Sequence, residues 1–115
     1  LEFSDITSLV VDGMMWLSTK DGAIRRYSRG EPSSFKISNL LDPFTSSLSL
    51  FTEEESQNLY VLEPRQKRLV ILDKNGTFVS SVHSDDMATA TSLVVDEESK
   101  KAYILSGSLV YEVEL

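Results

Sequence analysis

The chain consists of short runs in which apolar and polar residues alternate, separated by turn-forming residues. Runs such as residues 7–11, 59–63 and 102–106 are rich in Val, Leu, Ile and Tyr, and Gly, Asp, Asn, Lys and Pro stand between them. Short alternating runs of this kind are typical of β-strands, and no stretch of about 11 residues or more keeps the period of an amphipathic helix. The pattern therefore predicts an all-β fold.

A three-fold internal repeat orders these runs. TSLVVD occurs at residues 7–12 and again at 91–96, and LSLFTE at 48–53 is a diverged copy that leads into EEES as the last copy leads into DEES. A large apolar residue stands six positions before the aligned leucine of each copy, and these residues are Phe3, Phe44 and Met87. The spacing of 41 to 43 residues is typical of β-propeller blades, which are built from short strands.

Each repeat divides into successive strands. We expect first strands at residues 7–11, 48–52 and 91–95, second strands at 15–19, 59–63 and 102–106, and third strands at 23–28, 68–73 and 109–114. Fourth strands are predicted only at 34–38 and 77–82. The predicted fold is one partial β-propeller domain over residues 1–115, with three blades of about 42 residues at 3–43, 44–86 and 87–115, the last lacking its outer strand.

The second and third repeats resemble a known family. NLYVLEPRQKRLVILDKNGTFVSSV at residues 58–82, followed by TSLVVDEESKKAYILSGSLVYEVEL at 91–115, resembles the NHL-type β-propeller repeat in its aromatic residue, basic turn and Asn-Gly hairpin. More broadly, the chain resembles the C-terminal blades of bacterial β-propeller proteins. The resemblance implies an interaction module, and it implies a bacterial extracytoplasmic domain of a membrane-anchored protein.

Three blades are too few to close a propeller, which has about 4–8 blades. Because each repeat buries its apolar face only against a neighbour, we expect exposed apolar faces at both ends of the stack. Two arrangements would cover them. The chain is the C-terminal part of a larger propeller, or it forms a homo-oligomer in which two chains make a six-bladed ring. Residues 1–4 are a candidate edge strand across that junction.

Composition restricts the partners. The chain has 18 acidic and 11 basic residues and a net charge of −7, which argues against a nucleic-acid partner because such binding depends on Lys and Arg. The absence of cysteine excludes disulfides, thiol nucleophiles and Cys-ligated zinc. No apolar run reaches the length of about 18 residues that a transmembrane helix needs, so no membrane segment is expected.

Candidate catalytic and metal-binding groups are sparse. The single histidine, His83, lies near Asp85 and Asp86, which indicates a polar crossover more readily than a metal site, and no G-x-S-x-G motif is present. The sequence DKNG at 73–76 is a hairpin signal, because the glutamate that a calcium loop needs is missing. We therefore expect no cofactor, no metal and no enzymatic activity. A metal-dependent propeller hydrolase or lactonase is the alternative, although Thr7, Leu48 and Thr91 begin the first strands and offer no ligand set.

Four residues are candidate contacts for a ligand or partner. Trp16, Tyr60 and Tyr103 recur at one position of the repeat, either as packing between blades or as the aromatic ring of a glycan-binding propeller lectin. Arg25 lies in a basic cluster, but alternation places Arg26 on the opposite face, which argues against an RNA site. The acidic turns at 53–55 and 96–98 indicate either solvated turns or a rim for a basic peptide. The sequence thus predicts a protein- or ligand-recognition module.

Overall fold

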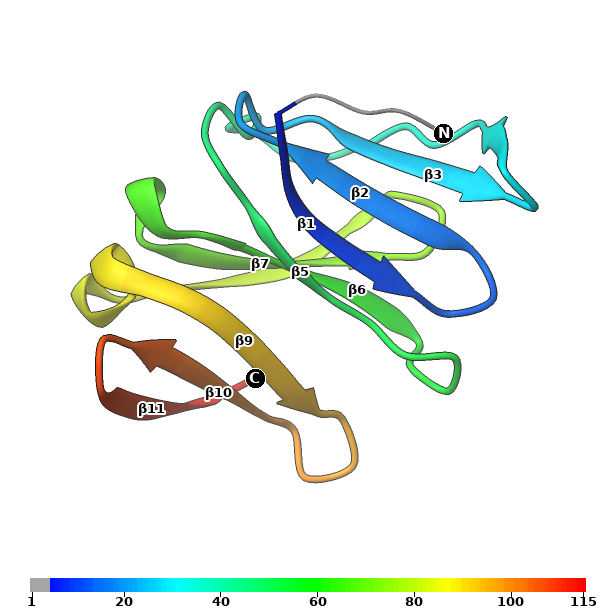
Figure 1. Ribbon diagram of the computed structural model, residues 1–115. Helices are drawn as coiled ribbons and strands as arrows, with labels where there is room; N and C mark the ends of the chain where they lie inside the picture. Colours follow the sequence, from blue (N-terminus) through cyan, green and yellow to red (C-terminus); the bar gives the residue numbers. More distant parts are fainter. Residues whose placement is uncertain (1–4) are drawn as a thin grey trace.

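A computed structural model describes residues 5–115, and three antiparallel sheets fill this range. The first sheet contains β1 (Ile6–Val11), β2 (Met15–Thr19), β3 (Ile24–Ser28) and β4 (Glu31–Ser33). The second contains β5 (Ser49–Phe51), β6 (Asn58–Glu63), β7 (Arg68–Asp73) and β8 (Phe78–His83). The third contains β9 (Ala90–Asp96), β10 (Lys101–Ser106) and β11 (Leu109–Glu114). The sheets are stacked, with the second between the other two (Figure 1).

The all-β prediction is confirmed. The strands predicted at 15–19, 68–73 and 109–114 coincide with β2, β7 and β11, and all but one of the others differ by a single residue at one or both ends. Short 3-10 helices, η1 (Pro64–Gln66) and η2 (Asp85–Thr89), occupy a turn and a crossover. Phe3, the start of the first predicted blade and the candidate edge strand at 1–4 lie outside the described residues.

The predicted fourth strand of the first repeat was wrong. The sheet ends with β4 at Glu31–Ser33, and residues 34–37 form no strand. The alternation of Phe35 and Ile37 that suggested a strand instead places both side chains against the core between the first two sheets. Ser38 then joins the second sheet through an isolated parallel bridge to Thr77. The segment is therefore a crossover that packs while it passes from one sheet to the next.

The strand registers confirm the repeat alignment. Leu9, Leu50 and Leu93 pair with Leu17, Val61 and Ile104 of the adjacent strand. The residue after each leucine pairs with the repeated aromatic residue, in the pairs Val10 with Trp16, Phe51 with Tyr60, and Val94 with Tyr103. Because side chains alternate along a strand, equivalent residues point to equivalent sides of the three sheets.

Two apolar layers hold the stack together, one on each face of the second sheet. Trp16 and Phe44 pack with Leu50, Val61 and Val70 between the first and second sheets. Tyr60 and Met87 pack with Leu62, Leu69, Leu93 and Ile104 between the second and third sheets. β6 and β7 therefore form nearly continuous apolar runs, as expected for strands that are buried on both faces.

A buried ion pair fixes the crossover between the first two sheets. Glu63 is fully buried, and its Oε1 accepts hydrogen bonds from Arg68 Nε at 3.0 Å and Arg68 Nη2 at 2.8 Å. Its other oxygen accepts hydrogen bonds from the backbone N–H groups of Thr45 and Ser46 at 2.9 and 3.1 Å. Arg68 also donates to the Asp42 carbonyl at 2.8 Å. The turn between β6 and β7 thus holds the chain segment that enters β5.

Candidate interaction surfaces

Trp16 lies between the first and second sheets. Its side chain is 1% exposed, and its ring makes an edge contact with Phe35 at a centroid distance of 4.9 Å. The Arg26 guanidinium lies 5.5 Å from the Trp16 ring centroid, and it donates to the Lys74 carbonyl of the second sheet at 3.1 Å. Trp16 is therefore a packing residue in this arrangement. Arg26 makes a cation–π contact with its ring and a hydrogen bond to Lys74, and thereby links the first two sheets.

A carboxylate satisfies the polar tip of Trp16. Its Nε1 donates to Asp12 Oδ1 at 2.8 Å, and Asp12 also accepts from Lys74 and from the Met14 backbone N–H. Burial alone would raise the pKa of Asp12, but the hydrogen bonds from Lys74, Trp16 and Met14 outweigh it and hold the pKa below its ordinary value. Lys74 also donates to the Glu53 carbonyl at 2.9 Å, so this contact joins the first and second sheets.

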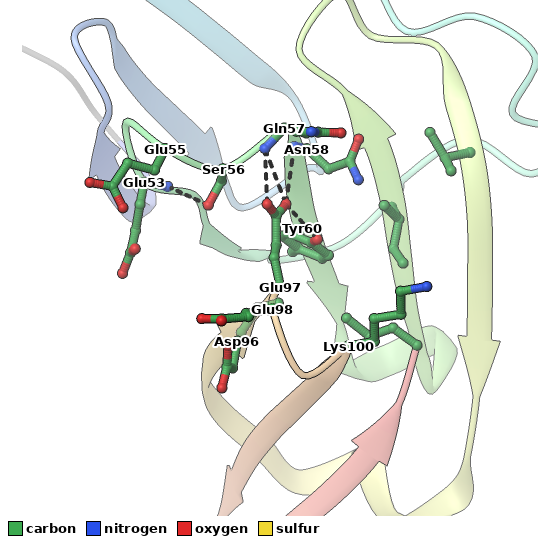
Figure 2. A pocket seen from close by; sticks show the side chains of 14 residues that line it. Glu53, Glu55, Ser56, Gln57, Asn58, Tyr60, Asp96, Glu97, Glu98 and Lys100 are labelled. Carbon is green, nitrogen blue, oxygen red and sulfur yellow. Dashed lines mark hydrogen bonds between the residues drawn. The ribbon is translucent and has the colours of Figure 1, made fainter.

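Tyr60 has a similar partner that comes from the neighbouring sheet. Its hydroxyl donates to Glu97 Oε2 at 2.7 Å, and the same carboxylate accepts from the backbone N–H groups of Gln57 and Asn58 at 3.1 and 3.3 Å (Figure 2). Burial, together with the adjacent Glu97 carboxylate, raises the pKa of Tyr60 to about 12. Glu97 therefore fastens the β9–β10 turn to the start of β6.

An acidic groove opens between these turns. It has a volume of about 640 Å³, and Glu53, Glu55, Asp96, Glu97 and Glu98 are among its lining residues, with Tyr60 on its wall (Figure 2). The two acidic turns therefore lie on one edge of adjacent sheets, as the repeat predicted. Their carboxylates create a negative potential at this edge.

The other two predicted contacts lie on the outer faces of the stack. Arg25 is exposed on β3 and points away from the second sheet, because its neighbour Arg26 points toward it. Tyr103 is half-buried on β10 and points away from the second sheet, because Ala102 and Ile104 pack against it. The structure thus brings Trp16 and Tyr60 into the interior layers and leaves Arg25 and Tyr103 at opposite ends.

Each outer face is apolar at its centre. We call the outer surface of the first sheet the β1 end face, made of Leu9, Val11 and Arg25; Leu17 shares their register but is only 3% exposed. We call the outer surface of the third sheet the β10 end face, made of Val94, Tyr103, Leu105, Val110 and Glu112. Leu9 is 55% exposed and Val94 is 54% exposed. Exposed apolar faces at both ends of the stack were predicted from the repeat, but the residues that form them were not assigned, because the outer strands resemble the interior strands.

The remaining candidate groups are His83, Asp85 and the DKNG segment. His83 is exposed at the end of β8, and Asp85 is paired with Lys67 at 3.2 Å. The DKNG segment forms a tight hairpin in which Asp73 Oδ1 accepts from the N–H groups of Asn75 and Thr77. Over residues 5–115, no group of three or more His, Cys, Asp or Glu side chains is arranged to hold a metal ion. Within that same range, every buried side-chain nitrogen and oxygen has a hydrogen-bond partner, so no orphaned group marks a ligand site.

No helix in the described part of the chain is long and apolar enough to cross a membrane.

Comparisons with known proteins identify the fold. No protein-family model and no curated protein matches the sequence. Among solved structures, the chain is similar to the WD40 domain of Neurospora crassa Pan2, with a TM-score of 0.62, 16% identity and coverage of 95% of this chain and 38% of that one. It is similar to Kluyveromyces lactis Hsv2, with a TM-score of 0.62, 10% identity and coverage of 95% and 32%. It is also similar to PorZ, a surface component of the type-IX secretion system of Porphyromonas gingivalis, with a TM-score of 0.56, 18% identity and coverage of 97% and 14%.

These similarities show the fold alone, because the identities are low. The chain spans between 14% and 38% of the length of these three chains. Its three stacked antiparallel sheets are a partial β-propeller, and the third sheet has three strands where the others have four.

Proposed function

We propose that the chain is a non-enzymatic β-propeller module for protein or ligand recognition, built from NHL-type repeats, whose end faces dock onto further blades. The observation that carries this proposal is the exposure, at both ends of the stack, of residues equivalent to those buried between the sheets. Leu9 is 55% exposed, whereas its equivalents Leu50 and Leu93 are 5% and 6% exposed. Exposed apolar patches of this kind mark interaction surfaces.

The docking partner completes the propeller ring, and there are two candidate partners. In one, the remaining blades of a larger propeller cover both end faces; the extracytoplasmic part of a bacterial membrane-anchored protein is our proposed setting. In the other, a second copy covers them. A glycan-binding lectin receives less support, because Trp16 and Tyr60 are enclosed between sheets and their rings offer little surface for stacking on a sugar.

The test is whether the end faces bind apolar surface at all. We expect the chain either to associate above its mass of 12.9 kDa or to bind a dye that fluoresces in apolar surroundings. The double substitution Leu9→Lys and Val94→Lys should abolish both effects while leaving the far-ultraviolet circular dichroism unchanged. The matched control is Ser47→Lys with Glu54→Lys, two exposed positions outside the end faces. A chain that stays at 12.9 kDa and binds no dye would contradict the proposal.

A further inference from the structure

β11 leaves one edge of the third sheet uncovered. In the other two sheets the third strand pairs with a fourth, so that β4 covers the edge of β3 and β8 covers the edge of β7. β11 pairs with β10 on one side, and over residues 5–115 no strand pairs with its other side (Figure 1). An uncovered strand edge presents a row of backbone groups to which another strand can bind.

The backbone of β11 directs some of its hydrogen-bonding groups outward. The Leu115 N–H group donates to the Lys100 carbonyl at 3.0 Å, in the register that pairs β11 with β10. Because hydrogen-bonded pairs alternate with non-bonded pairs along an antiparallel ladder, the N–H and C=O groups of Val110 and Glu112 point away from β10. Both residues therefore have donors and acceptors for a further strand.

The second sheet shows how such groups are used. Glu112 stands at the register position of Ile71, since both pair with the repeated tyrosine of the preceding strand. The Ser84 N–H group donates to the Lys67 carbonyl, so the same alternation directs the backbone groups of Ile71 to Ser80 of β8. β11 thus repeats the edge that β7 offers to β8.

A small pocket lies beside this edge, on the side of the third sheet that faces the second. It has a volume of about 190 Å³, and Met87, Ile104 and Val113 are among its lining residues. Val113 stands at the register position of Leu72, which pairs with Phe78 of β8. Phe78 packs against the apolar layer between the first and second sheets. A further strand on β11 would therefore place a side chain equivalent to Phe78 in this pocket.

The elements around this edge are acidic. β10, β11 and η2 together carry four acidic side chains and one basic one. Two of the four are balanced, Glu112 by Lys101 at 3.4 Å and Asp85 by Lys67 at 3.2 Å. Asp86, a third, lines the pocket. The excess of negative charge favours a basic partner, and it disfavours a second copy because this chain itself has a net charge of −7.

We propose that β11 binds an extended basic segment of a different protein, which adds to the third sheet as an antiparallel fourth strand. The outward backbone groups of Val110 and Glu112 hold the segment, and one large apolar side chain opposite Val113 enters the pocket. Strand addition of this kind obtains affinity from the main chain and selectivity from the pocket. This inference rests on the proposed function and names a partner for it, bound at a sheet edge and not at the end faces.

A synthetic peptide tests the site. The probe has the sequence of residues 77–84, which includes β8, between two lysines at each end, and calorimetric titration measures its binding to the chain. Replacing Phe78 of the peptide by Ala should weaken binding on the order of tenfold or more, because the pocket then stays unfilled. Replacing the four lysines by glutamates should also weaken it.

Methylated peptides and proline variants test the ladder. A methyl group on the peptide nitrogen of Ser80 removes an N–H group that faces the partner strand and should weaken binding on the order of tenfold or more, whereas the same group on Ser81, whose N–H faces away, should not. In the chain, Glu112→Pro removes an outward N–H group of β11 and should abolish binding with unchanged circular dichroism. Ser81→Pro does the same at the outer edge of β8 and is the matched control.

Each other outcome overturns the inference. A probe that does not bind would exclude the site, and the apolar dye would then decide the proposed function separately. Equal effects of the two methyl groups, or of the two prolines, would exclude strand addition at β11. Equal binding of the glutamate-flanked peptide would exclude a basic partner. A dimer at twice 12.9 kDa that the probe dissociates would assign the edge to a second copy.

Discussion

At the scale of single residues, two glutamate side chains hold chain segments together through hydrogen bonds. Glu63 accepts hydrogen bonds from Arg68 and from the backbone of residues 45 and 46. Glu97 does the same for Tyr60 and the backbone of residues 57 and 58. Neither role was predicted from the sequence, because a charge beside a turn is usually solvated. The role of Glu63 has one signal nearby in the chain, since Glu63 and Arg68 have opposite charges and flank the turn as a cross-strand pair.

Replacing Glu63 tests the first of these two sets of hydrogen bonds. Glu63→Ala leaves the Arg68 guanidinium buried without its partner, and we expect it to lower the free energy of unfolding by about 3–5 kcal/mol, measured by urea denaturation. Glu63→Gln keeps an oxygen acceptor for the crossover backbone and should cost less. Glu55→Ala, at an exposed position, should change the stability by no more than about 0.5 kcal/mol. Equal effects of Glu63→Ala and Glu55→Ala would contradict the buried role.

Titration of tyrosine tests the hydrogen bond between Tyr60 and Glu97. The chain has 4 tyrosines, and Tyr60 should keep its proton until the pH approaches its raised pKa of about 12. Since the pKa is higher in the folded chain, the stabilisation is fully present below the ordinary value of 10.0 and is lost as the pH rises through about 12. We expect ultraviolet absorbance to show an ionisation step near pH 12, which Tyr60→Phe removes and Glu97→Gln shifts to lower pH. A late step that persists in Tyr60→Phe would assign it elsewhere.

At the scale of elements, alternation was sufficient to place the strands that are covered on one or both faces. It failed at residues 34–38, where the same alternation belongs to a crossover. A local pattern reports which side chains are buried, but it does not report which sheet buries them. The end of the first sheet was missed because β4 is only three residues long, Glu31–Ser33, and contains a proline. The crossover is instead held by hydrogen bonds of Ser38 to Gly76 and Phe78, at 2.9 and 3.0 Å.

Gly76 is where the crossover and the β7–β8 hairpin meet. Its φ of +95° favours glycine, and a Cβ atom there would lie 2.1 Å from the Lys36 carbonyl oxygen. We expect Gly76→Ala to destabilise the chain by more than Gly107→Ala, in thermal unfolding of the two variants. Gly107 also has a positive φ, of +63°, but a Cβ atom there meets open space, so its substitution carries only the left-handed strain of about 1–2 kcal/mol. If both variants lost similar stability, the crossover segment would have to shift without cost to accommodate the added methyl group.

At the scale of the whole molecule, the middle sheet is more deeply buried than the two outer sheets. The second sheet is covered by the first on one face and by the third on the other (Figure 1). The first and third sheets each keep one face exposed. The repeat predicted this layering, since identical motifs at both ends of a stack cannot all be buried. The sequence did not assign the residues of the two end faces, because their positions depend on strand register.

Hydrogen exchange should follow this layering. Local opening takes least free energy where few apolar contacts are lost, so amides of β6 and β7 should exchange more slowly than those of β2 and β10. Mass spectrometry of peptides from deuterated chain would measure the order. Exchange that is as fast in β6 and β7 as in the outer sheets would contradict a stack whose stability centres on the second sheet.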